Sequence, residues 1–223
     1  MVSLEHGKSS NSPSARIQEI RNQGADGSAL CVRLENGSLF SLDANHPLAS
    51  RLEVGMSLED EELDSLQMAD ELRRCRQRAI DLLARREHCR KELHLKLRKR
   101  GFSQPAIHDS LDALVVRGWL DDARFAESWT HSRLRSRPEG ATKLCAALVA
   151  KGVSAPVARE AVHEVLEQRG DEDGMESLRR AWEKLSRRSS MTEEKLKAAL
   201  IRRGFSPGRV VHFLREHQDE VEE

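Results

Sequence analysis

The sequence of 223 residues has no tyrosine, and five Phe and three Trp are all that can fill a core with large aromatic groups. None of its four cysteines forms a Cys-x-x-Cys pair, which argues against a zinc ribbon and a disulfide framework. No apolar run approaches the ~20 residues that span a bilayer. We therefore expect a soluble, cytoplasmic protein that does not bind membranes.

Signatures of catalysis are also missing. The sequence has no glycine-rich phosphate loop, no Ser-His-Asp arrangement and no zincin helix. His88, Cys89 and His94 are metal-binding residue types, but the spacing of five between Cys89 and His94 places them on different faces of a helix. We predict that the protein is not an enzyme and has no catalytic residue, metal ion or cofactor.

Charge is abundant and unevenly distributed. Charged residues make up 33% of the chain, more than the usual ~25%, which favours solvated helices. The net charge of zero conceals a balance of −7 over residues 1–70, +7 over 71–140, +5 over 141–215 and −5 over the last eight residues. A basic body of this kind suits a polyanion or an acidic protein groove, with an affinity that falls as salt rises. The alternative is that the arginine-rich helices are simply well solvated.

The first 69 residues predict a small α+β segment. Residues 1–14 are too polar to fold, and we expect a disordered tail. Ala29–Leu42 is typical of a β-hairpin turning at Gly37. A two-residue turn mixes apolar and polar side chains on each face, whereas a three-residue turn pairs Val32 with Phe40 and Leu30 with Leu42 on one face. We favour the three-residue turn. Ile17–Ile20 is a candidate third strand.

Two helices are expected after the hairpin. Ser57 and Asp60 have the spacing of a capping box and indicate a short acidic helix through about Leu66. A longer helix is predicted over about Asp70–Arg86. The acidic segment with the hairpin and short helix is therefore assigned to residues 15–69.

From there the chain repeats. The pattern Leu-x3-Leu-x3-Gly, followed by Phe or Val and then Ser, occurs three times. Its glycine, at which a helix is predicted to end, is Gly101, Gly152 or Gly204. The leucines share one helical face, and glycine tolerates the left-handed conformation that ends a helix. The apolar residue after it closes a Schellman cap, serine caps the next helix, and proline occupies its first turn.

Each repeated helix pair follows a further helix, over about Asp70–Arg86, Asp122–Ser136 and Asp173–Arg188. We therefore predict a mainly α protein, an elongated array of three tandem three-helix repeats with the small α+β segment before it. The repeats are assigned to residues 70–118, 119–169 and 170–217, followed by an acidic tail over 218–223.

Several residues near the start of the second repeat have structural explanations. Asp121 is a predicted N-cap, and Phe125, Ala126 and Trp129 share one helical face typical of a core. Trp119 fits core packing better than base stacking. Arg124 lies off the apolar face, so that pairing with a carboxylate inside the repeat and contact with a partner remain equal alternatives.

Basic side chains are clustered near the turn of each repeat, which is what a protein following a periodic polyanion would show. The candidate partner-binding or DNA-binding residues are Arg86, Arg90, Lys96, Arg98, Lys99, Arg100, Arg124, Arg133, Arg135, Arg137, Arg202 and Arg203. Arg202 and Arg203, together with Arg187 and Arg188, form the third of these clusters.

The repeat resembles a known family. The element from Glu92 to Phe102 is similar to the recurring Glu-Leu…Leu…Lys-Gly pattern of RecX, the bacterial regulator of the recombinase RecA, and Gly118–Ala126 is close to the signature linking its first two units. The resemblance covers residues 70–215. The third unit departs from it, because Gly170-Asp171-Glu172-Asp173 stands where Gly118-Trp119-Leu120-Asp121 would be.

The resemblance implies a regulator that binds the RecA–single-stranded DNA filament and suppresses its ATP hydrolysis, strand exchange and coprotease functions. The implied partners are the RecA filament and single-stranded DNA, reached directly or through the filament, and we expect a monomer. Two alternatives remain. One is a DNA-binding protein that acts without RecA, by analogy with the helix-turn-helix. The other is a helical scaffold with no DNA role.

Overall fold

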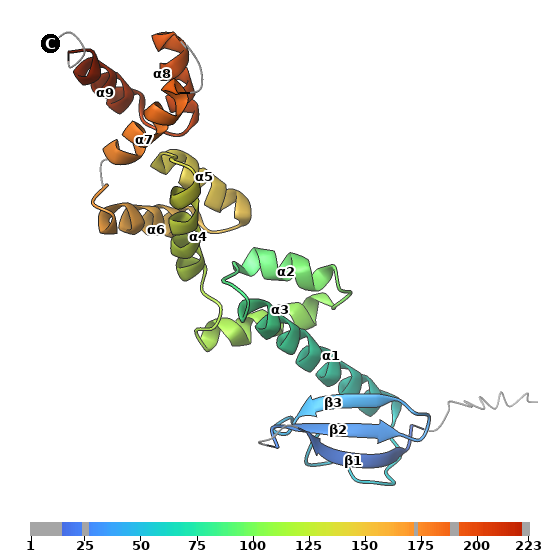
Figure 1. Ribbon diagram of the computed structural model, residues 1–223. Helices are drawn as coiled ribbons and strands as arrows, with labels where there is room; N and C mark the ends of the chain where they lie inside the picture. Colours follow the sequence, from blue (N-terminus) through green and yellow to red (C-terminus); the bar gives the residue numbers. More distant parts are fainter. Residues whose placement is uncertain (1–14, 24–26, 172–173, 188–191, 220–223) are drawn as a thin grey trace, which may run out of the picture. The chain divides into compact units, whose positions relative to one another are not determined.

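The computed structural model describes residues 15–23, 27–171, 174–187 and 192–219, and over these it has nine helices and three strands (Figure 1). The predicted tail over 1–14 and the last four residues lie outside the described part. The chain divides into two compact units. One comprises Met1–Arg78 with Gly101–Ser110, and the other comprises Ala79–Arg100 with Leu111–Glu223. The predicted mainly α fold with a small sheet is confirmed.

The sheet of the first unit is antiparallel, in the order β1-β2-β3. Its strands are β1 (Ile17–Gln23), β2 (Ala29–Leu34) and β3 (Leu39–Asp43). Val32 lies opposite Phe40 and Leu30 opposite Leu42, so the register with a three-residue turn is confirmed. Gly37 has φ +86°, the left-handed conformation that this turn requires. The expected third strand is present as β1.

One helix, α1 (Asp60–Leu83), replaces the two that the sequence predicted over 60–66 and 70–86. The predicted break was wrong, because no glycine or proline interrupts this stretch. Leu66 and Ala69 pack in the core beneath the sheet and hold the helix at the predicted break. Ser57 does not open the helix either. It lies in a bridge with Arg16, and the backbone N–H of Glu59 donates to Glu62 at 3.2 Å.

The remaining helices follow the repeat. They are α2 (Arg90–Arg98), α3 (Gln104–Val116), α4 (Asp122–Ser136), α5 (Ala141–Lys151), α6 (Ala155–Gln168), α7 (Met175–Ser186), α8 (Glu193–Arg202) and α9 (Pro207–Asp219). The glycines that end α2, α5 and α8 have φ of +86°, +104° and +88°. The Val153 N–H donates to the Leu148 carbonyl at 3.2 Å, and the Phe205 N–H to that of Leu200 at 3.4 Å, which is the predicted cap.

Aspartates cap the helices that open the second and third repeats. Asp121 accepts from the backbone N–H groups of Ala123 and Arg124 at 2.8 and 3.2 Å, as predicted. Asp171 does the same for α7, accepting from Glu176 and Ser177 at 2.9 and 3.1 Å. The third repeat thus keeps its entry cap although its sequence departs from the pattern.

Trp119 is 48% exposed, so the prediction that it packs in the core was wrong. Gly118 ends α3 with φ +68°, and Leu120 (2% exposed) occupies the buried position after it. The Arg117 guanidinium lies 5.7 Å from the Trp119 ring centroid on the outside. Phe125 and Ala126 are buried in the core of the second repeat and Trp129 is partly buried against it, as predicted.

None of the described helices is long and apolar enough to cross a membrane.

Candidate polyanion-binding site

The helix groups of the second unit are joined by one kind of contact, which we call the glycine junction. At the junction of α2 with the α5–α6 turn, the Cys89 thiol donates to the Lys151 carbonyl at 3.3 Å, and a Cβ on Gly152 would lie 2.3 Å from Lys91 Cδ. At the junction of α5 with the α8–α9 turn, the Gly140 N–H donates to the Arg203 carbonyl at 2.9 Å. A Cβ on Gly204 would lie 2.5 Å from Lys143 Cβ. Close packing therefore fixes how these groups stack.

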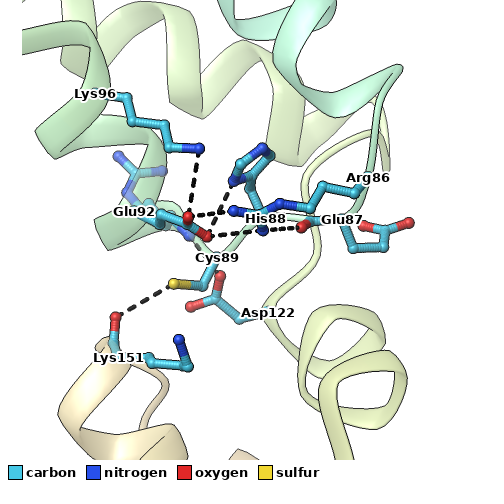
Figure 2. A network of polar contacts seen from close by, with 9 residues as sticks. Arg86, Glu87, His88, Cys89, Glu92, Lys96, Asp122 and Lys151 are labelled. Carbon is cyan, nitrogen blue, oxygen red and sulfur yellow. Dashed lines mark hydrogen bonds and ion pairs between the residues drawn. The ribbon is translucent and has the colours of Figure 1, made fainter. Parts of the chain in front are cut away.

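Figure 2 shows the polar network beside the first junction. Glu92 accepts hydrogen bonds from the Arg86 guanidinium at 2.5 and 3.1 Å and lies 3.4 Å from Lys96 Nζ. The buried His88 places its Nδ1 3.0 Å from Glu92 Oε2. Burial alone raises the pKa of Glu92, but Arg86 and His88 outweigh it and lower the pKa to about 2. Arg86 and Lys96, two predicted site residues, are thus engaged inside the protein.

Two more predicted site residues are also engaged in the second unit. Arg90 pairs with Asp112 at 2.6 Å, and its N–H donates to Asp122, so this carboxylate caps α2 from the first turn of α4. Arg124 donates to Glu87 at 2.7 Å and to the carbonyls of Gly118 and Trp119 at 3.1 and 3.0 Å. Arg124 therefore pairs with a carboxylate of the first assigned repeat, so the alternative of pairing inside its own repeat was wrong about the partner.

We expect the stability of the second unit to depend on pH because of His88. Burial lowers its pKa below the ordinary 6.5, despite the opposing effect of Glu92. The unfolded chain therefore binds the proton first as pH falls, and the free energy of unfolding of the second unit decreases below about pH 6.5. Glu92, with its pKa of about 2, stays ionised in this window.

We expect His88→Asn, which keeps a donor and does not titrate, to flatten that decrease. Urea unfolding of both proteins at pH 7 and pH 5 measures it. Equal losses of stability in the two proteins would contradict the assignment to His88.

Positive charge is concentrated where the end of α4 and the start of α5 meet α7. Two hollows of about 350 and 480 Å³ share Ser136, Pro138 and Lys184 as walls and form one groove. Seven basic and two acidic side chains line it, a net charge of +5. The basic ones are Arg135, Arg137, Lys143, Arg180, Lys184, Arg187 and Arg203. We call this the basic groove.

A buried ion pair supports the floor of the basic groove. The Glu139 carboxylate, 5% exposed, receives hydrogen bonds from Arg133 at 2.6 and 3.2 Å, and Lys143 Nζ lies 3.2 Å away. Burial alone raises the pKa of Glu139, but the hydrogen bonds from Arg133 and Lys143 outweigh it and keep the pKa below its usual value. Glu139 therefore stays charged and pairs with Arg133 and with Lys143, one of the cations that line the groove.

The structure thus brings together only part of the predicted set. Arg135, Arg137 and Arg203 line the basic groove, and Arg133 lies beneath it. Arg98, Lys99 and Arg100 are exposed at the end of α2, and Arg202 is exposed on α8. Arg188 lies outside the described residues.

Sequence reasoning placed Arg187 in the third basic cluster but missed Arg180 and Lys184 of α7. Arg180, Lys184 and Arg187 are spaced four and three residues apart, which places them on one helical face. That periodicity was available in the sequence. The approach of this face to Arg135 and Arg137 was not, because it depends on how the repeats stack.

Tandem three-helix groups with a basic groove define a class of helical repeat proteins in which each repeat contacts mainly its neighbours. Two family models match the chain, described as "RecX, first three-helix domain" over residues 75–114 and "RecX, second three-helix domain" over residues 121–162. α7–α9 lie beyond these two ranges.

Several curated relatives are named "Regulatory protein RecX". The one from Chromohalobacter salexigens is 44% identical over 114 residues, which cover 46% of this chain and 74% of the relative. The one from Treponema pallidum (strain Nichols) is 39% identical over 132 residues, covering 59% and 78%. The one from Chlorobium phaeobacteroides is 35% identical over 147 residues, covering 64% and 90%. The chain belongs to the RecX family of regulatory proteins.

A solved structure supports the fold. The crystal structure of a regulatory protein RecX aligns with a TM-score of 0.70 at 19% identity, covering 90% of this chain and 99% of that one. The likeness extends over most of the described helices.

Proposed function

We propose that this protein binds the RecA–single-stranded DNA filament and inhibits its recombinase, ATPase and coprotease activities. It would thereby modulate recombination, DNA repair and the SOS response in the cytoplasm. The observation that carries the proposal is the basic groove, which has seven lining cations and a net charge of +5 in a chain of zero net charge. Membership in a family of regulatory proteins supports the same conclusion.

The groove suits a phosphate backbone better than a small anion. Its cations come from α4, α5, α7 and the end of α8, so several phosphates or carboxylates are contacted at once. Arginine forks bind such groups in pairs. These contacts carry no sequence information, which fits a partner recognised by its backbone and periodicity.

The test is the single-stranded-DNA-dependent ATP hydrolysis of RecA, measured while this protein is added at moderate salt. We expect inhibition well below one copy per RecA, because a repeat protein can contact more than one protomer of a filament. Inhibition that appears only when the protein also coats bare DNA would contradict the proposal. It would favour the DNA-binding protein acting without RecA.

The structure offers that alternative little support as a helix-turn-helix. The second helix of each pair would have to present its surface to phosphates. On α3 that surface carries His108, Asp109 and Asp112, and on α6 it carries the exposed Glu160 and Glu167. Carboxylates in these positions repel a DNA backbone.

A further inference from the structure

The two glycine junctions follow one template. In each junction, two helix pairs meet. The donor half is the N-cap residue of the first helix in one pair. The glycine half is the turn of the next pair, where the carbonyl of the basic residue before the glycine accepts the hydrogen bond. The donor is the Cys89 thiol in one junction and the Gly140 N–H in the other, and the acceptors are the carbonyls of Lys151 and Arg203. The glycine is required because the incoming helix leaves no room for a side chain.

Each half of this template occurs once more, at the two ends of the array. The α2–α3 turn has the glycine half. Arg98, Lys99 and Arg100 precede Gly101, whose added Cβ would meet nothing within 4 Å among the described residues. The N-terminus of α8 has the donor half. Thr192 is its N-cap, exposed and with no side-chain capping bond of its own in the described structure.

The two end halves also have opposite charge. Glu193 and Glu194 occupy the first turn of α8 and are exposed, whereas the α2–α3 turn presents three exposed cations. The internal junctions bring basic residues together instead, with Lys91 on Gly152 and Lys143 on Gly204. The charges of the two end halves are therefore complementary. Their helix dipoles also align, because an N-terminus meets a C-terminus.

We propose that a second copy of this chain docks end to end, with the start of α8 in one copy on the Arg98–Gly101 turn of the next. Thr192 then donates to the Arg100 carbonyl, and Glu193 and Glu194 lie against Arg98 and Lys99. The contact is head to tail, so it extends an array rather than closing a dimer. A turn meeting a helix end is smaller than a standard interface, so copies are monomeric in dilute solution and associate when concentrated or aligned on a common partner.

Sedimentation velocity of the full-length protein tests this without RecA or DNA. At about 0.05 M salt we expect the mean sedimentation coefficient to rise with protein concentration, and at about 0.5 M salt we expect this rise to disappear. Glu193→Lys with Glu194→Lys, or Arg98→Glu with Lys99→Glu, removes the rise. An equimolar mixture of the two double variants restores it, because each then offers a complementary end to the other.

The control is Glu160→Lys with Glu167→Lys on α6, which changes the net charge as the first double variant does and leaves both ends intact. It is expected to associate like the native protein. Two outcomes overturn the proposal. One is a native protein with no concentration dependence up to about 0.5 mM, where contacts of even sub-millimolar affinity are populated. The other is a mixture that associates no more than its separate components.

Discussion

Gly140→Ala is expected to lower the free energy of unfolding of the second unit by about 2–3 kcal/mol, because overpacking against a fixed neighbour costs this much. Gly140 has φ −78°, so alanine is not strained by its own backbone. Its Cβ would, however, lie 2.2 Å from the Gly204 carbonyl oxygen and 2.6 Å from the Phe205 nitrogen. Both are backbone atoms and cannot rotate away.

A matched substitution, Gly208→Ala, is expected to raise the free energy of unfolding instead. Gly208 lies in the first turn of α9 with nothing within 4 Å of an added Cβ in the described structure. Alanine there reduces the entropy of the unfolded chain, and we expect a gain of about 0.5 kcal/mol. Urea unfolding followed by circular dichroism and by tryptophan fluorescence measures both. Equal effects of the two alanines would show that the α5–α8 junction does not form.

Removing the charge of the basic groove is expected to weaken binding to single-stranded DNA in the filament by about two orders of magnitude at ~0.1 M salt. Each phosphate contact releases about 0.7 of a counterion, so four lost contacts lower the slope of log affinity against log salt by about 3. The variant is Arg135→Ala, Arg137→Ala, Lys184→Ala and Arg187→Ala. The four side chains are exposed, so the fold should be retained.

Its control replaces four exposed arginines elsewhere, Arg159, Arg169, Arg179 and Arg215, with alanine. The net charge then changes equally, and only the place of the change differs. Fluorescence anisotropy of labelled RecA–DNA filaments over a salt series compares the two variants. If both lose affinity equally, diffuse attraction rather than the basic groove explains binding.

The repeat fold could be predicted because each feature of its pattern has a local physical cause. Leucines four apart, a left-handed glycine and a capping residue act within a few residues, so their spacing located Gly101, Gly152 and Gly204 correctly. The hairpin register followed from pairing Val32 with Phe40, which places the apolar side chains on one face of the hairpin. For α1, the absence of glycine and proline was visible in the sequence, but the packing of Leu66 beneath the sheet is a long-range contact that the local pattern does not show.

The candidate site was less predictable than the fold. A cluster of basic residues in the sequence does not reveal which carboxylates lie opposite it in space. Glu92 engages Arg86 and Lys96, and Glu87 engages Arg124. The cations that line the basic groove come from segments about 50 residues apart, and only the stacking of the repeats brings them together.

The adjacent carboxylates Asp121 and Asp122 cap two different helices, α4 and α2. α2 has only nine residues, and its own N-cap, Cys89, makes no side-chain capping bond. A helix this short is marginal in isolation. The cap that Asp122 provides comes from 32 positions after Arg90, so we expect α2 to be fully stable only once the start of the second repeat has been synthesised. In a chain ending at residue 118, we expect α2 to be frayed at its start.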